Sequence, residues 1–459
     1  MVNFETRIGP PDLIPQTSYP KTQTPQWFLD AKLGFFIHYG LYSIPAWAYQ
    51  PQGETIPLED AYTYHQYAEW YANTYRIENS PCRKFHEASF GVGTSYEDFA
   101  DRFTPQADKL TETVKLLVAA GAKYLVPTAK HHDGFCLWDT QTTDFNSAKR
   151  GAKLDVIDLI TKLTREAGVK VGIYFSGALD WHCADFPPIQ SDREIFTYRR
   201  NDPAFARYAA AQLTELIDRF KPELLWNDID WPDAGKSNTK YSLSQLLKTF
   251  FTKTPEGIVN DRWGIPYHGY LTREYTHVAN IIEKPWEATR GLGKSFGVNH
   301  HEADTDFLTL KGLLLYFTDV VSKGGNLLLN VGPNADGSLE PRQATLIRGL
   351  GKWMERYGKF IYGSRPWIRH LAEPACIPSP TDERYLLLPA THPAAGLAVV
   401  IRDRTASHFL VPLDFPETTG YWYWEGNTYP IPITPGQEVK LPPANSNLPI
   451  ILHLPNHQA

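Results

Sequence analysis

The chain has 459 residues, of which 42% are hydrophobic and 21% are charged, a composition typical of a globular protein and not of a disordered one. The 45 Lys and Arg against 51 Asp and Glu give a net charge of −6, which argues against a protein that binds nucleic acid through phosphate contacts. A chain of this length can hold a barrel of about 200 to over 400 residues and a second module.

Between about residues 25 and 365, short apolar runs alternate with amphipathic stretches. The apolar runs predict buried strands, and the stretches with apolar side chains every three to four residues predict helices. The expected strands are Gly34–His38, Tyr124–Pro127, Val169–Ser176, Glu223–Asp228, Gly257–Trp263 and Gly325–Val331. The expected helices are Ala107–Ala120, the stretch from Val156 to Ala167, Pro203–Phe220 and Trp353–Phe360. This alternation indicates βαβ units and a parallel sheet covered on both faces.

The ends of the expected strands favour a closed barrel over an open nucleotide-binding sheet. No GxGxxG follows the first strand, and the glycine-rich stretch Gly291–Gly297 has the wrong spacing. Most of the strands end in polar or aromatic residues, such as His38, Tyr174 and Arg262. Functional groups at the carboxyl ends of several strands are typical of a (β/α)₈ barrel.

From residue 366 onward the pattern changes to short β-prone runs separated by Pro, Gly and Asn turns. This pattern predicts an antiparallel β-sandwich. We therefore expect an α/β protein with two domains, a (β/α)₈-like barrel over residues 1–365 and a C-terminal β-sandwich over residues 366–459.

Two carboxylates follow the expected strand Glu223–Asp228. Asp228 and Asp230 are two residues apart, and such residues share one face of a strand, so periodicity alone does not choose between them. A carboxylate at a strand end among aromatic side chains suits a nucleophile for an anomeric carbon. Helix capping is the structural alternative for both residues.

Glycoside hydrolysis needs a second carboxyl group that protonates the leaving oxygen. Glu274 lies in a loop or strand shortly after Arg262 and can supply it. Glu283 and Glu287 compete for this role on position alone.

Histidines occur at two strand ends, as His38 and as the pair His131 and His132 beside Asp133. A metal site is one interpretation, as it is for the group from His300 to Asp306. No HExxH motif is present, and adjacent residues on an extended chain point to opposite sides. Neutral imidazoles that bind sugar hydroxyls therefore explain these histidines better, and we expect neither a metal nor another cofactor.

Five motifs resemble those of the glycoside hydrolase family 29 α-L-fucosidases, in the same order along the chain. They are WFLDAKLGFFIHYGLYSIP (27–45), YAEWY (67–71), KHHDGFCLW (130–138), WND (226–228) and GGNLLLNVGP (324–333). The resemblance extends from about residue 25 to 365 and implies a (β/α)₈-like barrel followed by a β-sandwich. It also implies a retaining exo-α-L-fucosidase that acts through a covalent fucosyl-enzyme on fucosylated glycans.

The resemblance assigns roles to particular residues. It implies Asp228 as the nucleophile, because relatives often have Gly at the position of Asp230, and Glu274 as the general acid/base within the sequence Thr-Arg-Glu-Tyr. The substrate-binding residues that it implies are His38, Glu69, Trp70, His131, His132, Tyr174, Trp226, Arg262 and Phe296. Among these, Trp226 and Phe296 correspond to aromatic walls beside the apolar face and the C6 methyl group of fucose.

Two residues depart from the family pattern. Tyr39 replaces the usual Trp, which predicts an altered pocket wall, and Asp230 places a second charge near the nucleophile.

No run of about 20 apolar residues is present, and the N-terminus lacks the features of a signal peptide. We therefore expect a cytoplasmic protein without a membrane or nucleic-acid partner. The sequence does not fix the linkage that is cleaved or the oligomeric state, and a homo-oligomer in which a neighbouring subunit completes the site is an open alternative.

Overall fold

The computed structural model describes most of the chain. The described residues are 19–20, 23–51, 53–183, 185–236, 240–367, 370, 385–390, 396–402, 404, 407–415, 417–424, 427–443 and 446–455. In the part of the chain that these ranges cover, no helix is long and apolar enough to cross a membrane.

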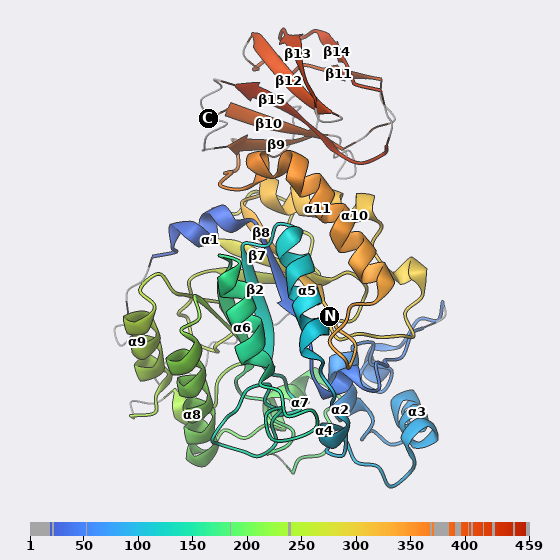
Figure 1. Cartoon of the computed structure of the whole chain (residues 1–459), viewed down its shortest axis with the longest axis vertical. Helices are drawn as coiled ribbons and strands as arrows, with labels where there is room; N and C mark the ends of the chain where they lie inside the picture. The colour runs from blue at the N-terminus through green and yellow to red at the C-terminus, as the bar shows by residue number, and fades with distance from the viewer. Residues whose placement is uncertain are drawn as a thin grey trace.

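Eight parallel strands form one curled sheet in the order β5-β4-β3-β2-β1-β8-β7-β6, which is a barrel-like arrangement (Figure 1). The strands are β1 (Leu33–Ile37), β2 (Tyr124–Lys130), β3 (Lys170–Ser176), β4 (Leu224–Asp228), β5 (Ile258–Val259), β6 (Leu271–Glu274), β7 (Trp286–Gly291) and β8 (Gly325–Val331). The fold class predicted from the sequence is confirmed.

The two ends of the sheet, β5 and β6, are joined by polar contacts instead of a full ladder. The Gly269 amide donates to the Val259 carbonyl at 2.9 Å. The Asp261 carboxylate accepts from the Thr272 amide at 3.1 Å and from the Thr272 hydroxyl at 2.7 Å. These contacts hold β6, which carries Glu274, beside the end of β5.

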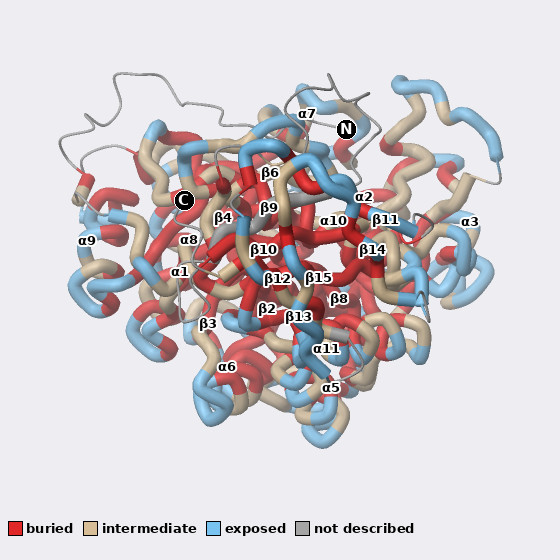
Figure 2. The backbone as a smooth tube through the Cα atoms, turned by 90° about the horizontal axis from the view of Figure 1, so that it is seen from above, coloured by how far each residue is buried: buried red, intermediate tan, exposed pale blue. Residues whose placement is uncertain are grey.

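Helices surround the strands (Figure 1). They are α1 (Gln26–Ala31), α2 (Tyr71–Thr74), α3 (Pro81–Phe90), α4 (Phe99–Arg102), α5 (Ala107–Ala119), α6 (Val156–Glu166), α7 (Asp192–Thr197), α8 (Pro203–Phe220), α9 (Leu243–Lys253), α10 (Leu310–Ser322) and α11 (Pro341–Ile361). Most of the long helices bury one apolar face against the strands, and Figure 2 shows the buried backbone concentrated toward the middle of the molecule.

The barrel interior is filled by large side chains and is not a pore. The lumen cluster contains inward-facing residues of β1 to β5 and β8, among them Phe36, Tyr124, Tyr174 and Trp226. Such layers of side chains fill the interior of a barrel, and the functional groups lie at the carboxyl ends of its strands.

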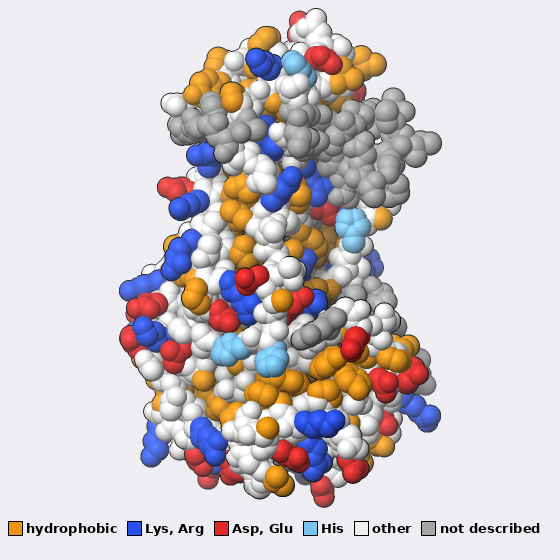
Figure 3. Space-filling view, turned by 90° about the vertical axis from the view of Figure 1, so that its right-hand side faces the viewer, with side chains coloured by type: hydrophobic (Ala, Val, Ile, Leu, Met, Phe, Trp, Pro, Cys, Tyr) orange, Lys and Arg blue, Asp and Glu red, His pale blue; other side chains and the backbone are white. Residues whose placement is uncertain are grey.

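The C-terminal strands form two antiparallel sheets, of order β13-β12-β15-β10-β9 and β11-β14. The strands are β9 (Tyr385–Ala390), β10 (Gly396–Ile401), β11 (His408–Leu410), β12 (Thr418–Trp424), β13 (Asn427–Ile433), β14 (Glu438–Lys440) and β15 (Ile450–Pro455). They form a separate lobe above the larger body in Figure 1. On the face of the whole molecule that Figure 3 shows, acidic and basic side chains are interspersed. The predicted domain boundary at residue 365 lies shortly before residues 368–369 and 371–384, which are outside the described residues, and it stays a prediction.

Helix α11 connects the two bodies. The Trp353 indole donates to the Pro449 carbonyl at 2.8 Å, and the Tyr357 hydroxyl donates to the Tyr423 carbonyl at 2.7 Å. Trp422, which directly precedes Tyr423 in β12, is buried. The C-terminal sheet therefore packs against the barrel through α11.

Candidate active site

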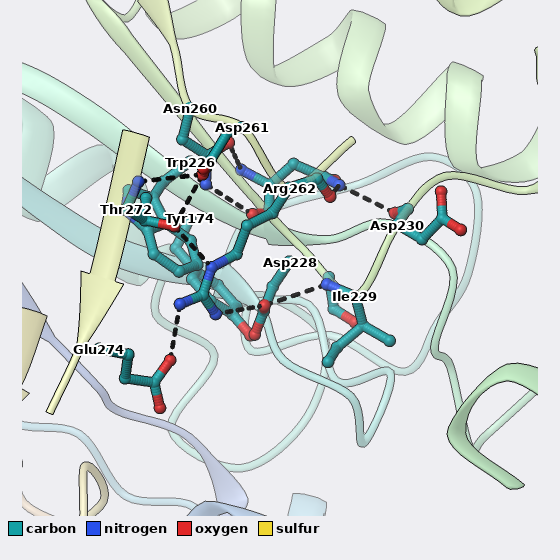
Figure 4. A network of polar contacts seen from close by, with 12 residues as sticks. Tyr174, Trp226, Asp228, Ile229, Asp230, Asn260, Asp261, Arg262, Thr272 and Glu274 are labelled. Carbon is teal, nitrogen blue, oxygen red and sulfur yellow. Dashed lines mark hydrogen bonds and ion pairs between the residues drawn. The ribbon is translucent and has the colours of Figure 1, made fainter. Parts of the chain in front are cut away.

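Asp228 is the last residue of β4, and its carboxylate has three hydrogen-bond donors (Figure 4). The Tyr174 hydroxyl donates to Oδ2 at 2.9 Å, and Arg262 Nη1 and the Ile229 amide donate to Oδ1 at 3.1 and 3.0 Å. Nε2 of His132 lies 3.7 Å from Oδ2. These three donors fix the direction of the carboxylate at the end of the strand.

Asp230 points away from this site, although it is only two residues from Asp228 (Figure 4). Strand β4 ends at Asp228, and Ile229 and Asp230 both have left-handed backbone conformations, with φ of 52° and 73°. The alternation of strand faces therefore ends before Asp230. Its carboxylate instead pairs with Arg199 at 3.0 Å and Lys236 at 2.8 Å, which offset its charge.

Arg262 bridges the two carboxylates that the sequence singled out. Its Nη1 donates to Asp228, and its Nη2 donates to Glu274 Oε2 at 2.7 Å. The guanidinium lies over the Trp226 ring, 4.6 Å from its centroid, and Nε donates to the Thr272 hydroxyl at 3.0 Å. Burial opposes the charge of this arginine, but the Glu274 and Asp228 carboxylates outweigh it and raise its pKa.

Glu274 ends β6 and faces the same space as Asp228 (Figure 4). Burial raises the pKa of Glu274, Arg262 opposes this rise, and the Asp228 charge adds to it. A carboxyl group with a raised pKa is suited to donate a proton near neutral pH.

The two competing glutamates lie elsewhere. Glu287 is fully buried in the barrel interior, where it accepts from the Tyr124 hydroxyl at 2.5 Å and the Trp226 indole at 3.1 Å. Glu283 is exposed in the loop before β7. Of the three glutamates, Glu274 is the one that contacts Arg262.

The three predicted histidines lie together, with the His131 ring 4.1 Å from that of His132 and 5.7 Å from that of His38. His131 stacks on the Tyr174 ring at 5.4 Å, and the His38 ring lies 5.3 Å from it. Nδ1 of His38 contacts Asn330 Oδ1 at 2.6 Å, and Nδ1 of His132 contacts the Ser176 hydroxyl at 2.7 Å. Burial lowers the pKa of His38 and of His132 to about 4, and it lowers that of His131 as well. All three imidazoles are therefore neutral at physiological pH.

Among the described residues, no group of three or more His, Cys, Asp or Glu side chains is arranged to hold a metal ion. His300 and His301 are not part of the site around Asp228. His300 contacts Asn334 at 3.0 Å, and His301 lies beside the Trp47 ring.

Aromatic side chains and one more carboxylate complete the site. Trp226 stacks on Tyr174 at 5.5 Å, and Phe296 lies 5.0 Å from the His38 ring. Trp70 contacts the His132 ring edge to face at 5.5 Å. Glu69, directly before Trp70, is buried and accepts from the Gly297 amide at 2.8 Å. The structure thus places the eleven residues singled out by the sequence around one site at the carboxyl ends of the strands.

One departure from the family pattern lies outside this site. The Tyr39 hydroxyl donates to the Ala335 carbonyl at 2.6 Å, and its ring packs on Phe103 at 5.1 Å. The expectation that Tyr39 alters the pocket wall is therefore wrong, because its side chain packs into the core beside β1.

Sequence reasoning missed several supporting residues. Thr272 orients Arg262, and Asn330 contacts His38. Asn330 lies within the GGNLLLNVGP motif and Thr272 within the Thr-Arg-Glu-Tyr sequence, so both were inside stretches that the sequence had already marked. Their side-chain directions depend on the barrel register, which the sequence alone does not give.

The fold and the site together define a barrel glycoside hydrolase. The α-L-fucosidase family profile matches residues 14–359. The chain is 30% identical to an α-L-fucosidase of Dictyostelium discoideum over 353 residues, covering 75% of this chain and 72% of that protein. It is 31% identical to the tissue α-L-fucosidase of Homo sapiens over 357 residues, covering 75% and 70%. The chain therefore belongs to the α-L-fucosidase family.

Solved structures extend the similarity over both bodies. A Thermotoga maritima α-fucosidase superposes with a TM-score of 0.81 at 38% identity, covering 94% of this chain and 97% of that one. A Thermotoga maritima α-L-fucosynthase, solved in complex with α-L-Fuc-(1-2)-β-L-Fuc-N3, superposes with a TM-score of 0.83 at 38% identity, covering 94% and 96%.

Proposed function

We propose that this α-L-fucosidase is a retaining exo-enzyme in which Asp228 is the nucleophile and Glu274 is the general acid/base. The observation that carries the proposal is the single guanidinium of Arg262, which contacts both carboxylates. Two carboxylates bridged by one guanidinium face one small space. A short separation of about 5–5.5 Å is typical of retaining enzymes, whereas inverting enzymes need about 6.5–9.5 Å.

In the first step, Asp228 Oδ2 or Oδ1 attacks the anomeric carbon and the bond from this carbon to the leaving oxygen breaks. Glu274 gives its proton to that oxygen, so that the aglycone departs as an alcohol. Tyr174 and Arg262 hold the Asp228 carboxylate in a fixed direction, which limits the reorganisation needed on attack. The raised pKa of Glu274 supports its protonated form at the start.

In the second step, water attacks the anomeric carbon of the fucosyl-enzyme. Glu274, now a carboxylate, takes a proton from this water, and the bond between the sugar and Asp228 breaks. Arg262 stabilises both carboxylates when they are charged. Two inversions at the anomeric carbon give net retention.

The histidines, Glu69 and the aromatic side chains suit a neutral sugar. The three imidazoles are neutral, so each can exchange hydrogen bonds with a sugar hydroxyl. Trp226 and Phe296, which lie beside Tyr174 and His38, are the aromatic walls for the C–H face and the C6 methyl group of fucose. The proposed substrates are fucosylated glycans with a terminal α-L-fucose.

Hydrolysis of 4-nitrophenyl α-L-fucoside, followed by NMR with and without EDTA, tests the proposal. We expect α-L-fucose as the first product, at a rate that the chelator does not change. Release of β-L-fucose first would exclude the retaining mechanism, and loss of activity with EDTA would indicate a metal-dependent reaction.

A further inference from the structure

The glycine-rich loop Gly291–Gly297 follows β7 and carries Phe296. The spacing of its glycines does not match a nucleotide-binding motif. The glycines instead allow the loop to pass close to neighbouring segments. A Cβ atom at Gly293 would lie 2.5 Å from the Glu302 carboxylate, and one at Gly297 would lie 3.2 Å from the Glu69 amide. The loop therefore passes close to two buried glutamates on different segments.

Glu302 holds the loop from one side. Its Oε1 accepts from the amides of Lys294 and Ser295 at 2.6 and 2.8 Å. The residue is 6% exposed, and its own carbonyl accepts from Arg342 Nη1 at 2.7 Å. One oxygen thus fixes two successive peptide groups directly before Phe296.

Contacts on the other side join the loop to the active site. Glu69 Oε2 accepts from the Gly297 amide and from the Ser295 hydroxyl at 3.3 Å. The Asn330 amide donates to the Phe296 carbonyl at 2.6 Å, and the Tyr275 hydroxyl donates to the Lys294 carbonyl at 2.8 Å. Glu69 is one of the proposed substrate-binding residues and Tyr275 directly follows Glu274, so the loop lies against the proposed active site.

A pocket lies beside the loop, lined by Gly293, Ser295, Phe296, Gly297 and Glu302 together with residues of neighbouring segments. The amides of the loop next to this pocket are held by hydrogen bonds, and Glu302 accepts two of them.

We propose that Glu302 is a positioning residue that fixes the loop Gly291–Gly297, and through it the Phe296 wall, against the C6 methyl group of fucose. This inference rests on the proposed function, which places Phe296 beside the sugar. Glu302 does not touch the substrate and acts through the backbone of Lys294 and Ser295.

The test compares Glu302→Leu, Glu302→Asp and Glu302→Gln in the full chain. Glu302→Leu keeps a similar volume but removes the acceptor. We expect its KM for 4-nitrophenyl α-L-fucoside and the inhibition constant of L-fucose to rise about tenfold or more, with kcat within about threefold. Glu302→Asp keeps the carboxyl group but withdraws its oxygen from the loop, and we expect a rise in KM of about threefold or more.

Glu302→Gln provides the rescue. Burial raises the pKa of Glu302 to about 7, and the loop uses only an acceptor oxygen, which a glutamine also offers. We expect its KM to stay within about threefold of that of the unaltered chain, a loss smaller than that of Glu302→Asp.

Discrimination at C6 is the second measurement. The 4-nitrophenyl α-L-galactoside differs from the fucoside only by a hydroxyl group on C6. A displaced Phe296 leaves room for this hydroxyl, so the ratio of kcat/KM for the two sugars is expected to fall at least about threefold in Glu302→Leu. If that variant does not fold, Glu302→Asp is measured instead, with the same direction expected.

Glu340 is the matched control, because it lines the same pocket but makes no hydrogen bond to the loop. Glu340→Gln should leave KM and the sugar ratio unchanged. The inference is overturned if Glu302→Leu keeps both the KM and the sugar ratio of the unaltered chain. Where Glu302→Leu does not fold, the same result in Glu302→Asp overturns it. It is also overturned if Glu302→Gln raises KM as much as Glu302→Leu does. An unaltered chain without activity on the fucoside would instead contradict the proposed function.

Discussion

At the scale of single residues, the left-handed turn after Asp228 separates two carboxylates that the sequence could not distinguish. Strand periodicity puts positions two apart on one face, but Ile229 and Asp230 leave the strand conformation. Asp228 consequently meets Tyr174 and Arg262, whereas Asp230 meets Arg199 and Lys236. The two aspartates should therefore give opposite results in the same chemical experiment.

Asp228→Gly is expected to lower kcat on 4-nitrophenyl α-L-fucoside on the order of a thousandfold or more, because no nucleophile remains. Added azide should restore part of the activity by attacking the anomeric carbon in the space that the carboxylate leaves. The measurements are the rate with and without azide and the identity of the fucosyl azide.

Asp230→Asn is the matched comparison. It weakens the pairing with Arg199 and Lys236 and should cost stability, since both cations are buried. It should show no azide rescue. Rescue in this variant but not in Asp228→Gly would assign the nucleophile to Asp230.

Glu274→Gln tests the proposed acid/base. On methyl α-L-fucoside, whose leaving group must be protonated, kcat/KM should fall about 10²–10⁴-fold. On 4-nitrophenyl α-L-fucoside the loss in the first step should be smaller, because nitrophenolate departs without a proton.

The dependence of kcat/KM on pH tests whether Glu274 acts in its protonated form. Because burial raises the pKa of Glu274, its acid form persists above the usual carboxyl range, and kcat/KM should fall as pH rises through the raised value. Glu274→Gln should remove this alkaline limb, while Glu283→Gln, an exposed control, should keep it. An unchanged profile in Glu274→Gln would exclude Glu274 as the acid.

At the scale of elements, the sequence predicts the strands that contain an apolar run and misses β6 and β7, which contain none. Strands β3, β4 and β8 match their expected ranges within a residue, and α8 matches fully. Strands β6 and β7, with the sequences LTRE and WEATRG, have no apolar run because Thr272, Glu274 and Glu287 turn polar groups inward. The contact of Asp261 with Thr272 joins the two ends of the sheet and arises only when the sheet curls.

Helix α8 shows why local signals suffice for some elements. Asp202 caps its amino end by accepting from the Ala204 and Phe205 amides at 2.9 and 3.0 Å, and Pro203 occupies the first turn. Asp202→Ala should lower the free energy of unfolding by about 0.5–2 kcal/mol. Chemical denaturation measures this loss, and Asp218→Ala, which removes only an exposed ion pair with Lys253, should cost less. Equal losses would show that Asp202 contributes no more than an exposed ion pair and does not stabilise the helix as a cap.

At the scale of the whole molecule, the barrel and the C-terminal sheets share α11. This helix packs on the barrel side through residues such as Leu350 and contacts the sheet through Trp353, Tyr357 and Phe360. The sequence predicted the change to β structure after this helix, but not which of its faces the sheet covers. The long-range contacts from Trp353 to Pro449 and from Tyr357 to Tyr423 have no local signal.

The junction gives the last prediction. Trp353→Phe and Tyr357→Phe each remove one donor and leave the Pro449 or Tyr423 carbonyl without that partner. Each variant should lower the free energy of unfolding by about 1–3 kcal/mol. The two rings are 5.0 Å apart, so the loss in the double variant should differ from the sum of the single losses.

Because neither ring contacts the site residues, kcat and KM on 4-nitrophenyl α-L-fucoside should stay within about twofold. Unchanged unfolding would mean that the sheet contributes nothing to the stability of the barrel through these two contacts. A changed KM with unchanged unfolding would instead mean that α11 transmits the position of the sheet to the active site.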